Sequence, residues 1–173
     1  MKLLIYVLLI ATITGCSKDD KADVLMSNGS FELNGSFTDD DWLVIGGSSS
    51  SDAPTDGGNF SLRLDPQVFP DEGYAEYVIS GLTGVQNLTI SAYIKAFGDW
   101  PSSITVSKLT ADNVTTVLAT TSSNAAEWTE SSVSISSQFE EGDELLIKLS
   151  AGTTETPVSI QYVLFDLITV QQN

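Results

Sequence analysis

The residues of this chain that could do chemistry are almost all carboxylates. Its 173 residues include 23 Asp and Glu but no histidine, and the single cysteine is Cys16. Without histidine there is no Ser-His-Asp triad, no Cys-His pair and no histidine-bearing zinc site. An enzyme would have to rely on a pair of carboxylates, and no spacing in the sequence selects one pair. The chemistry that remains is oxygen ligation of a cation and aromatic stacking.

The charge balance narrows the class of partner. Only 7 Lys and Arg oppose the 23 acids, which gives a formal net charge of −16. A surface this acidic argues against nucleic acid and anionic lipid head groups as partners. It suits divalent cations and neutral ligands such as glycans, and it also favours solubility. One cysteine allows no internal disulfide, so stability must come from a core, with a metal as a further contributor.

The N-terminal residues resemble a bacterial lipoprotein signal peptide. Lys2 precedes an apolar run at 3–13 that is too short to span a bilayer, and residues 13–16 read ITGC, a lipobox pattern ending at Cys16. Residues 17–20, SKDD, resemble the tag that sends lipoproteins of Bacteroidetes-type bacteria to the cell surface. The resemblance implies lipidation of Cys16 and a location on the outer membrane, exposed at the cell surface. The alternative is an uncleaved membrane anchor with a chance cysteine.

These features divide the chain into three expected parts. A lipoprotein signal peptide covers 1–15, a lipidated tether covers 16–26, and one domain covers 27–173. About 150 residues are enough for one domain to bury about two-thirds of its unfolded surface. We see no internal repeat and no second domain.

The patterning of the domain predicts strands and no helices. From residue 28 onward, short apolar segments alternate with clusters of Gly, Ser, Thr, Asn and Asp, which are typical of turns. The clearest alternation predicts strands at 88–97 and 145–150. Further strands are predicted at 60–64, 75–79, 104–109, 115–119, 133–137 and 158–170. The pattern indicates an all-β protein with an antiparallel β-sandwich, and the serine run at 48–51 is expected to be a solvated loop.

A series of short motifs runs through the predicted domain in a definite order. The series consists of NGSFE at 28–32, Trp42, GGNFSLRL at 57–64, ISGL at 79–82, the predicted strand 88–97, Trp128 and FDLITV at 165–170. In order and spacing it resembles the galactose-binding-like jelly-roll domains, especially the carbohydrate-binding modules of the 4/9 and 22 types. The resemblance covers about residues 28–170. It implies a jelly-roll sandwich that binds glycans without catalysis.

The same resemblance implies a structural calcium ion where the first strand, an early loop and the last strand meet. The implied ligands are Ser30 through its backbone carbonyl, the carboxylates of Glu32 and Asp166, and oxygens from Asp56 and Gly58. Calcium accepts six to eight hard oxygen ligands, including mixtures of carboxylates and carbonyls. The alternative is that these acids are solvated at strand ends. One departure from the family pattern is Leu167, which stands where a second acid usually follows the terminal Asp.

Aromatic side chains carry the glycan hypothesis, because pyranose rings stack on exposed aromatic faces. The candidate ligand residues are Phe69, Tyr74, Tyr93 and Trp100. The resemblance implies an aromatic ligand site in the region of Phe69 and Tyr74, whereas Tyr93 points away from the apolar side of its strand. Trp42 and Trp128 are expected in the core. The alternative for the candidate set is edge packing under loops.

These observations favour a non-catalytic glycan-binding module on a surface lipoprotein. It would capture a polysaccharide or oligosaccharide for a neighbouring uptake or degradation system, with structural calcium holding the scaffold and not touching the sugar. The alternative is a structural or protein-interaction sandwich on the outer membrane surface. An enzyme is the third option, and it would need two carboxylates facing each other in a cleft.

Overall fold

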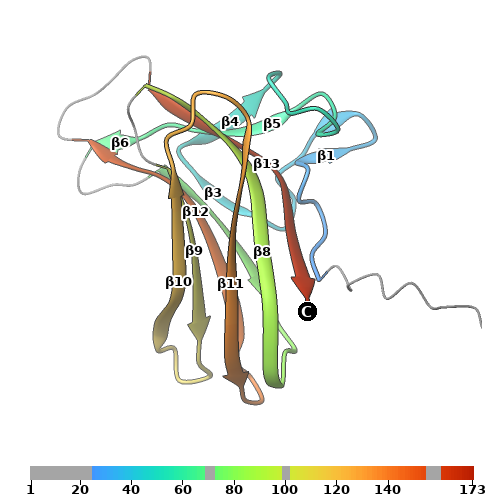
Figure 1. Ribbon diagram of the computed structural model, residues 1–173, viewed down its shortest axis with the longest axis vertical. Coiled ribbons are helices and arrows are strands. Elements are labelled where there is room, and N and C mark those ends of the chain that lie inside the picture. Colours follow the sequence, from blue (N-terminus) through green and yellow to red (C-terminus); the bar gives the residue numbers. More distant parts are fainter. Residues whose placement is uncertain (1–24, 69–72, 99–101, 155–160) are drawn as a thin grey trace, which may run out of the picture.

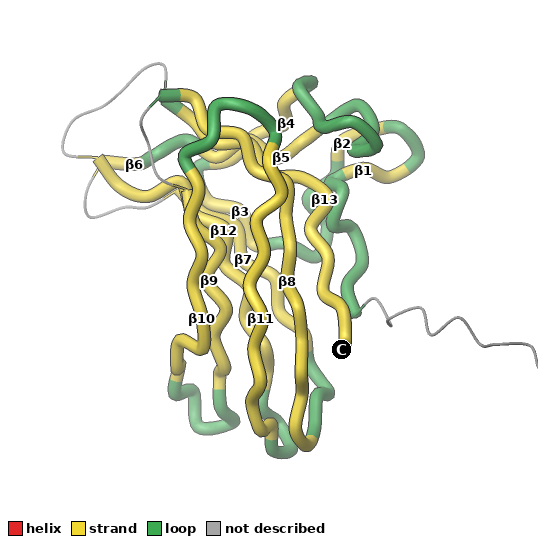
Figure 2. Tube along the Cα trace, in the orientation of Figure 1, coloured by secondary structure: helices red, strands yellow, loops and turns green. Residues whose placement is uncertain are grey.

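The structure is a computed structural model that describes residues 25–68, 73–98, 102–154 and 161–173. All regular structure in these ranges is β-strand (Figures 1 and 2). The strands are β1 (Glu32–Leu33), β2 (Ser36–Phe37), β3 (Leu43–Ile45), β4 (Gly47–Ser50), β5 (Ser61–Leu64), β6 (Gln67–Val68), β7 (Gly73–Ile79), β8 (Gly84–Phe97), β9 (Ser102–Leu109), β10 (Thr115–Ser123), β11 (Thr129–Phe139), β12 (Glu144–Thr154) and β13 (Tyr162–Gln172). Within the described ranges, no helix could cross a membrane.

The strands form two main sheets and a small hairpin. The six-stranded sheet has the order β10-β9-β12-β7-β3, with β6 also paired to β12, and the five-stranded sheet has the order β11-β8-β13-β5-β4. β1 pairs with β2 as a separate hairpin. The pairings are antiparallel except that of β6 with β12, which is parallel. The predicted antiparallel sandwich is therefore confirmed.

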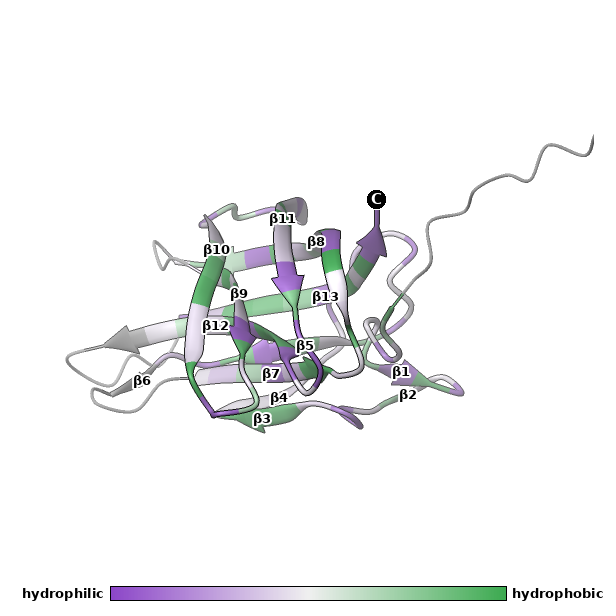
Figure 3. Cartoon of the chain, turned by 90° about the horizontal axis from the view of Figure 1, so that it is seen from below, coloured by the Kyte–Doolittle hydropathy of each residue, from purple (hydrophilic) through white to green (hydrophobic). Residues whose placement is uncertain are grey.

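The core lies between the two sheets, because apolar residues alternate along the long strands. On β8 the inward residues from Leu88 to Ala96 are buried, and on β12 Leu145, Ile147 and Leu149 are buried. Figure 3 shows this alternation as hydrophobic and hydrophilic segments along the strands. Side chains in a strand point alternately to the two faces, so one set packs inward and the other covers the outside. Each large apolar side chain buried in this way contributes about 1.5–3 kcal/mol.

The alternation also defines two outer faces, one on each sheet. The six-strand face is the outer surface of the six-stranded sheet, formed by Leu43, Ile45, Tyr74, Glu76, Val78, Leu146, Lys148 and Ser150. The five-strand face is the outer surface of the five-stranded sheet, formed by Arg63, Thr89, Ser91, Tyr93, Lys95, Phe97 and Tyr162. Any ligand that binds a sheet surface must use one of these two faces.

Short strands at the edges are the main difference from the sequence prediction. The serine run expected as a loop forms most of β4, which pairs with β5 at the edge of its sheet. β3 at the edge of the other sheet was also not predicted, because three residues are too few to show alternation. An edge strand needs backbone partners on one side only, so it accepts small polar residues that lie outside the core.

Two tryptophans that the sequence places together in the core have different environments. Trp42 is buried, and its ring lies 5.2 Å from that of Phe31 and 5.1 Å from that of Tyr77, as predicted. Trp128 is only half-buried and lies just before β11 at the outer side of the five-stranded sheet, so its prediction as a core residue is wrong. There its indole N–H donates to the carboxylate of Asp52, a charged partner that an apolar core would not supply.

The described sandwich includes two residues that the sequence prediction assigns to the tether. Leu25 and Met26, which the sequence assigns to the tether, pack against the hydrophobic core. The backbone N–H of Leu25 also donates to the carbonyl of Val170 at 3.0 Å. These two residues therefore belong structurally with the sandwich.

Candidate functional site

The terminal motif places Asp166 in a buried position on β13. Its side chain is fully buried; Oδ1 accepts the Leu167 N–H at 2.7 Å, and Oδ2 has no hydrogen-bond partner in the described structure. The β13–β8 register shifts between Asp166 and Thr169, and Leu167 has a φ of 49°. A bulge of this kind re-aims a side chain, which here leaves a carboxylate oxygen buried and unsatisfied.

Two consecutive glycines give Asp166 and Glu32 room to approach the loop between β4 and β5. A side chain at position 57 would collide with Asp166 Oδ2, and one at position 58 would collide with the Glu32 carboxylate. Gly58 also has a φ of 84°, which favours glycine. The Asn59 N–H donates to Glu32 Oε1 at 2.9 Å. The two acids therefore meet beside the same short loop, as the calcium hypothesis requires of them.

The electrostatics of this pair are unfavourable for two anions. Burial raises the pKa of Asp166 to about 7; the Leu167 N–H opposes that rise, and the negative charge of Glu32 adds to it. A cation beside the two carboxylates would offset this penalty, since a nearby positive charge favours the ionised form.

Asp56 does not complete a cluster of three carboxylates. No group of three or more acids that could hold a metal occurs among the described residues, and Asp56 is exposed. The donor set that fits calcium is therefore two carboxylates plus backbone oxygens from the loop and from the β1 segment, where Ser30 lies. The presence of the ion stays a prediction.

Tyr74 is an aromatic residue of the six-strand face, near the start of β7. It is half-buried on β7, and Lys148 Nζ from β12 lies 4.6 Å from its ring centroid, a cation–π contact. Glu76 is two residues further along the same face, and it lies directly opposite Lys148 in the β7–β12 register. The face thus combines an aromatic ring, a hydrogen-bond acceptor and a donor.

A hollow lies at the β3–β7 side of this face. It has a volume of about 450 Å³, and its lining includes Leu43, Glu76 and Val78. Leu43, Ile45 and Val78 are 54%, 43% and 45% exposed, so apolar surface is available beside the polar groups. A concave site with apolar walls and a few polar groups is typical of a small-molecule site.

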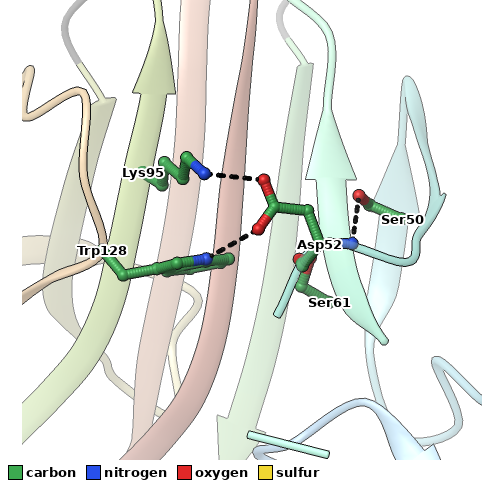
Figure 4. A network of polar contacts seen from close by, with 5 residues as sticks. All are labelled: Ser50, Asp52, Ser61, Lys95 and Trp128. Carbon is green, nitrogen blue, oxygen red and sulfur yellow. Dashed lines mark hydrogen bonds and ion pairs between the residues drawn. The ribbon is translucent and has the colours of Figure 1, made fainter. Parts of the chain in front are cut away.

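The five-strand face carries a different arrangement, centred on Asp52 (Figure 4). Lys95 Nζ donates to Asp52 Oδ2 at 2.8 Å, and the Trp128 indole N–H donates to Oδ1 at 3.0 Å. The backbone of Asp52 is held by Ser50 and by Ser61, whose Oγ donates to its carbonyl at 2.6 Å. Although burial acts to raise the pKa of Asp52, the hydrogen bonds from Lys95 and Trp128 and the charge of Lys95 lower it overall.

The aromatic rings beside this network stack on one another. The rings of Phe97 and Tyr162 lie 4.2 Å apart at 22°, and the Arg63 guanidinium lies 4.1 Å from the Tyr162 ring centroid. Phe97 and Arg63 cannot occupy the same side of that ring, so both faces of Tyr162 are covered. A sugar ring would have to displace one of these partners.

The structure therefore separates the aromatic residues that the sequence groups together. Tyr74 lies on the six-strand face and Tyr93 on the five-strand face, so they cannot belong to one stacking surface. Phe69 and Trp100 lie outside the described residues, as does Cys16. Sequence reasoning missed Glu76, although strand alternation places it beside Tyr74. It also missed Lys148, because only the register of β12 against β7 brings that residue to the same place.

Comparisons with known proteins identify the fold. No protein-family model and no curated protein sequence matches the chain. Among solved structures, a family 16 carbohydrate-binding module superposes with a TM-score of 0.61 at 18% identity, covering 84% of this chain and 98% of that one. The tandem CBM22 domain of Paenibacillus barcinonensis Xyn10C has a TM-score of 0.58 at 20% identity, covering 87% and 46%. TmCBM61, solved with β-1,4-galactotriose, has a TM-score of 0.56 at 11% identity, covering 88% and 100%.

At these identities the likeness shows the fold alone. The chain has the β-sandwich fold of carbohydrate-binding modules, and the resemblance seen in its sequence motifs is confirmed at this level. What it binds must be argued from its own residues, because one fold supports many functions.

Proposed function

We propose that the protein is a non-catalytic glycan-binding module and that its ligand lies across Tyr74 on the six-strand face. The observation that carries this proposal is the half-buried Tyr74 ring with Lys148 against it, on the same face as Glu76, which lines a hollow of about 450 Å³. The shared fold supports it, because several similar structures are carbohydrate-binding modules.

The chemistry of the face suits a sugar. The Tyr74 ring offers an apolar surface on which the C–H face of a pyranose stacks, and Glu76 offers carboxylate oxygens that accept hydrogen bonds from hydroxyl groups. The Lys148 ammonium donates to ring or hydroxyl oxygens. The strands fix the backbone positions of all three groups, so no backbone order has to be gained on binding.

A structural calcium ion is part of the proposal. Glu32 and Asp166 would hold it, with backbone oxygens from the 56–58 loop and from Ser30, and the unpartnered Asp166 Oδ2 supports this assignment. When bound, the ion supplies positive charge that compensates two carboxylates held close together. The ion would tie the β1 segment, the 56–58 loop and β13 together, and neither Glu32 nor Asp166 belongs to the six-strand face.

We also propose that the module is anchored by lipid at Cys16 and exposed on the outer membrane surface, where it captures polysaccharide for a neighbouring uptake or degradation system. Support comes from ITGC at 13–16 and SKDD at 17–20. Cys16→Ala should move the protein from the membrane fraction to the soluble fraction. Asp19→Ala with Asp20→Ala should leave it facing the periplasm, and unchanged protease accessibility on whole cells would contradict surface export.

A protein partner is the second candidate, and one observation favours it. Leu43, Ile45 and Val78 form an exposed apolar strip on the six-strand face. Exposed apolar patches often mark protein interfaces. The hollow and the charged groups beside Tyr74 favour a glycan over a flat protein surface.

The test is a glycan array probed with residues 25–173, followed by binding measurements on two matched variants. Tyr74→Ala and Tyr93→Ala each remove one half-buried tyrosine, from opposite faces of the sandwich. Tyr74→Ala should reduce affinity at least about tenfold, as expected when a stacking residue worth more than 1.4 kcal/mol is lost. Loss of binding only in Tyr93→Ala would move the site to the five-strand face. An array with no binding would favour the protein-partner alternative.

A further inference from the structure

The hollow on the six-strand face adjoins a second one. The first, here the sheet hollow, has Leu43, Glu76 and Val78 among its lining residues. The second, here the edge hollow, has a volume of about 540 Å³ and lies beyond β3, between the 27–28 segment and the β1–β2 hairpin; its lining includes Leu33 and Asp40. Both volumes lie within the range of about 300–1,000 Å³ that is usual for ligand pockets.

A hydrogen-bonded junction lies between the two hollows. Ser27 and Asp41 line both of them, and Ser27 Oγ donates to Asp41 Oδ2 at 3.0 Å. The Tyr77 hydroxyl, from the core side of β7, lies 3.1 Å from Ser27 Oγ and accepts the Ser27 N–H at 3.2 Å. These bonds fix the two residues that the hollows share, so the hollows adjoin each other at Ser27 and Asp41.

The edge hollow is built around a firmly held asparagine. Asn28 Nδ2 donates to the carbonyls of Thr38 at 3.2 Å and Asp40 at 2.9 Å, and the Asn28 carbonyl accepts the Trp42 indole N–H at 3.2 Å. Asn28 Oδ1 is buried without a hydrogen-bond partner in the described structure. This oxygen is closed off from solvent, so contacts to a ligand in the edge hollow come from the exposed groups of its lining.

The charges around both hollows have one sign. Apart from Glu32, which the calcium proposal uses as a ligand of the ion, their lining includes the carboxylates of Asp40, Asp41 and Glu76, and among the described lining residues there is no lysine or arginine. Leu33, which is 59% exposed, supplies apolar wall to the edge hollow. Such a surface accepts hydrogen bonds from hydroxyl groups, and it repels a ligand that carries carboxylates or sulfates.

We infer that the binding groove extends past the sheet edge, so that an uncharged glycan chain runs from the sheet hollow across Ser27 and Asp41 into the edge hollow. The inference rests on the proposed function, because it extends the same site. It names the ligand class as a neutral chain of several sugar units and excludes uronic-acid and sulfated glycans. Longer chains gain affinity by contacts that Tyr74 does not make.

The test uses isothermal titration of residues 25–173 with cello-, xylo-, manno- and β-1,4-galacto-oligosaccharides of two to six units. Asp40→Ala alters the edge hollow, and Asp39→Ala is the matched control, because Asp39 is an exposed neighbouring acid outside both linings. For the series that binds, wild-type affinity should rise with length. Asp40→Ala should weaken the longest chain by about tenfold, as for a lost hydrogen bond to a charged group. It should leave the shortest bound chain unchanged, and Asp39→Ala should match wild type.

The outcomes separate the two claims. If Tyr74→Ala weakens every length while Asp40→Ala behaves like Asp39→Ala, the glycan site stands and the extension into the edge hollow is wrong. If no series binds, or if Tyr74→Ala has no effect at any length, the proposed site fails and the extension fails with it. Oligogalacturonates of the same lengths should not bind, and binding as tight as that of the neutral series would overturn the assigned ligand class.

Discussion

Trp42 and Trp128 show how differently one residue type is used in this sandwich. Trp42 is buried between Phe31 and Tyr77, whereas Trp128 is half-buried and holds Asp52 through its indole N–H. Trp42→Ala should lower the free energy of unfolding by about 3–5 kcal/mol, as for a large core aromatic. Trp128→Ala should cost about 1–2 kcal/mol, because it removes one hydrogen bond and partial packing. Urea unfolding of both variants checks this, and equal costs would contradict the different environments.

Asp52 should make stability depend on pH through its lowered pKa. A carboxylate whose folded-state pKa is depressed stabilises the fold above its unfolded pKa of about 3.9, and the contribution is lost as pH falls through the folded value. The side chain is 39% exposed, so solvent screening limits the effect to about 1 kcal/mol or less. Asp52→Asn should therefore be less stable than wild type at pH 7 in urea unfolding.

At pH 3, urea unfolding should give a smaller difference in free energy of unfolding between Asp52→Asn and wild type. Asp112→Asn is the control, because Asp112 is an exposed turn residue and its loss should change little at either pH. If Asp52→Asn lowers the free energy of unfolding equally at both pH values, the side chain acts through its shape and not through its charge.

At the scale of elements, Glu32 and Asp166 lie where three segments meet. These are β13, the loop at 56–58 and the segment that carries β1. A ligand that binds only the folded state stabilises it by about 2.7 kcal/mol at a hundredfold excess over Kd. For a domain of this size that corresponds to a rise of about 5–10 °C in Tm on adding calcium. EDTA should reverse the rise, and Asp166→Asn should abolish it. A Tm that changes with neither calcium nor EDTA would contradict the proposed calcium site.

The long strands could be predicted from sequence because each carries enough alternation to identify a buried side. Residues 88–97, 104–109 and 145–150 all lie within observed strands. β3 and β4 could not be predicted, since they are short edge strands whose residues are mostly exposed. Their existence depends on backbone pairing with β7 and β5, and local sequence carries no record of such pairing.

At the scale of the molecule, the sequence predicted the sandwich but not how its two faces divide the candidate residues. Alternation alone shows that Tyr74 and Tyr93 point outward from their strands, yet it does not say that the two strands belong to different sheets. The strand order β10-β9-β12-β7-β3 resolves this, because it brings Lys148 beside Tyr74 and leaves Tyr93 on the opposite layer. Long-range pairing was the missing information.

The central claim is that a glycan lies on the six-strand face, and mapping the bound ligand tests it most directly. A titration of ¹⁵N-labelled residues 25–173 with the tightest-binding neutral oligosaccharide would be followed by amide chemical shifts. We predict that the largest shifts fall on β7 and β12, at residues 74–78 and 146–150, and at Leu43 on β3. Shifts concentrated on β8 and β13, around Tyr93, Phe97 and Tyr162, would contradict the claim.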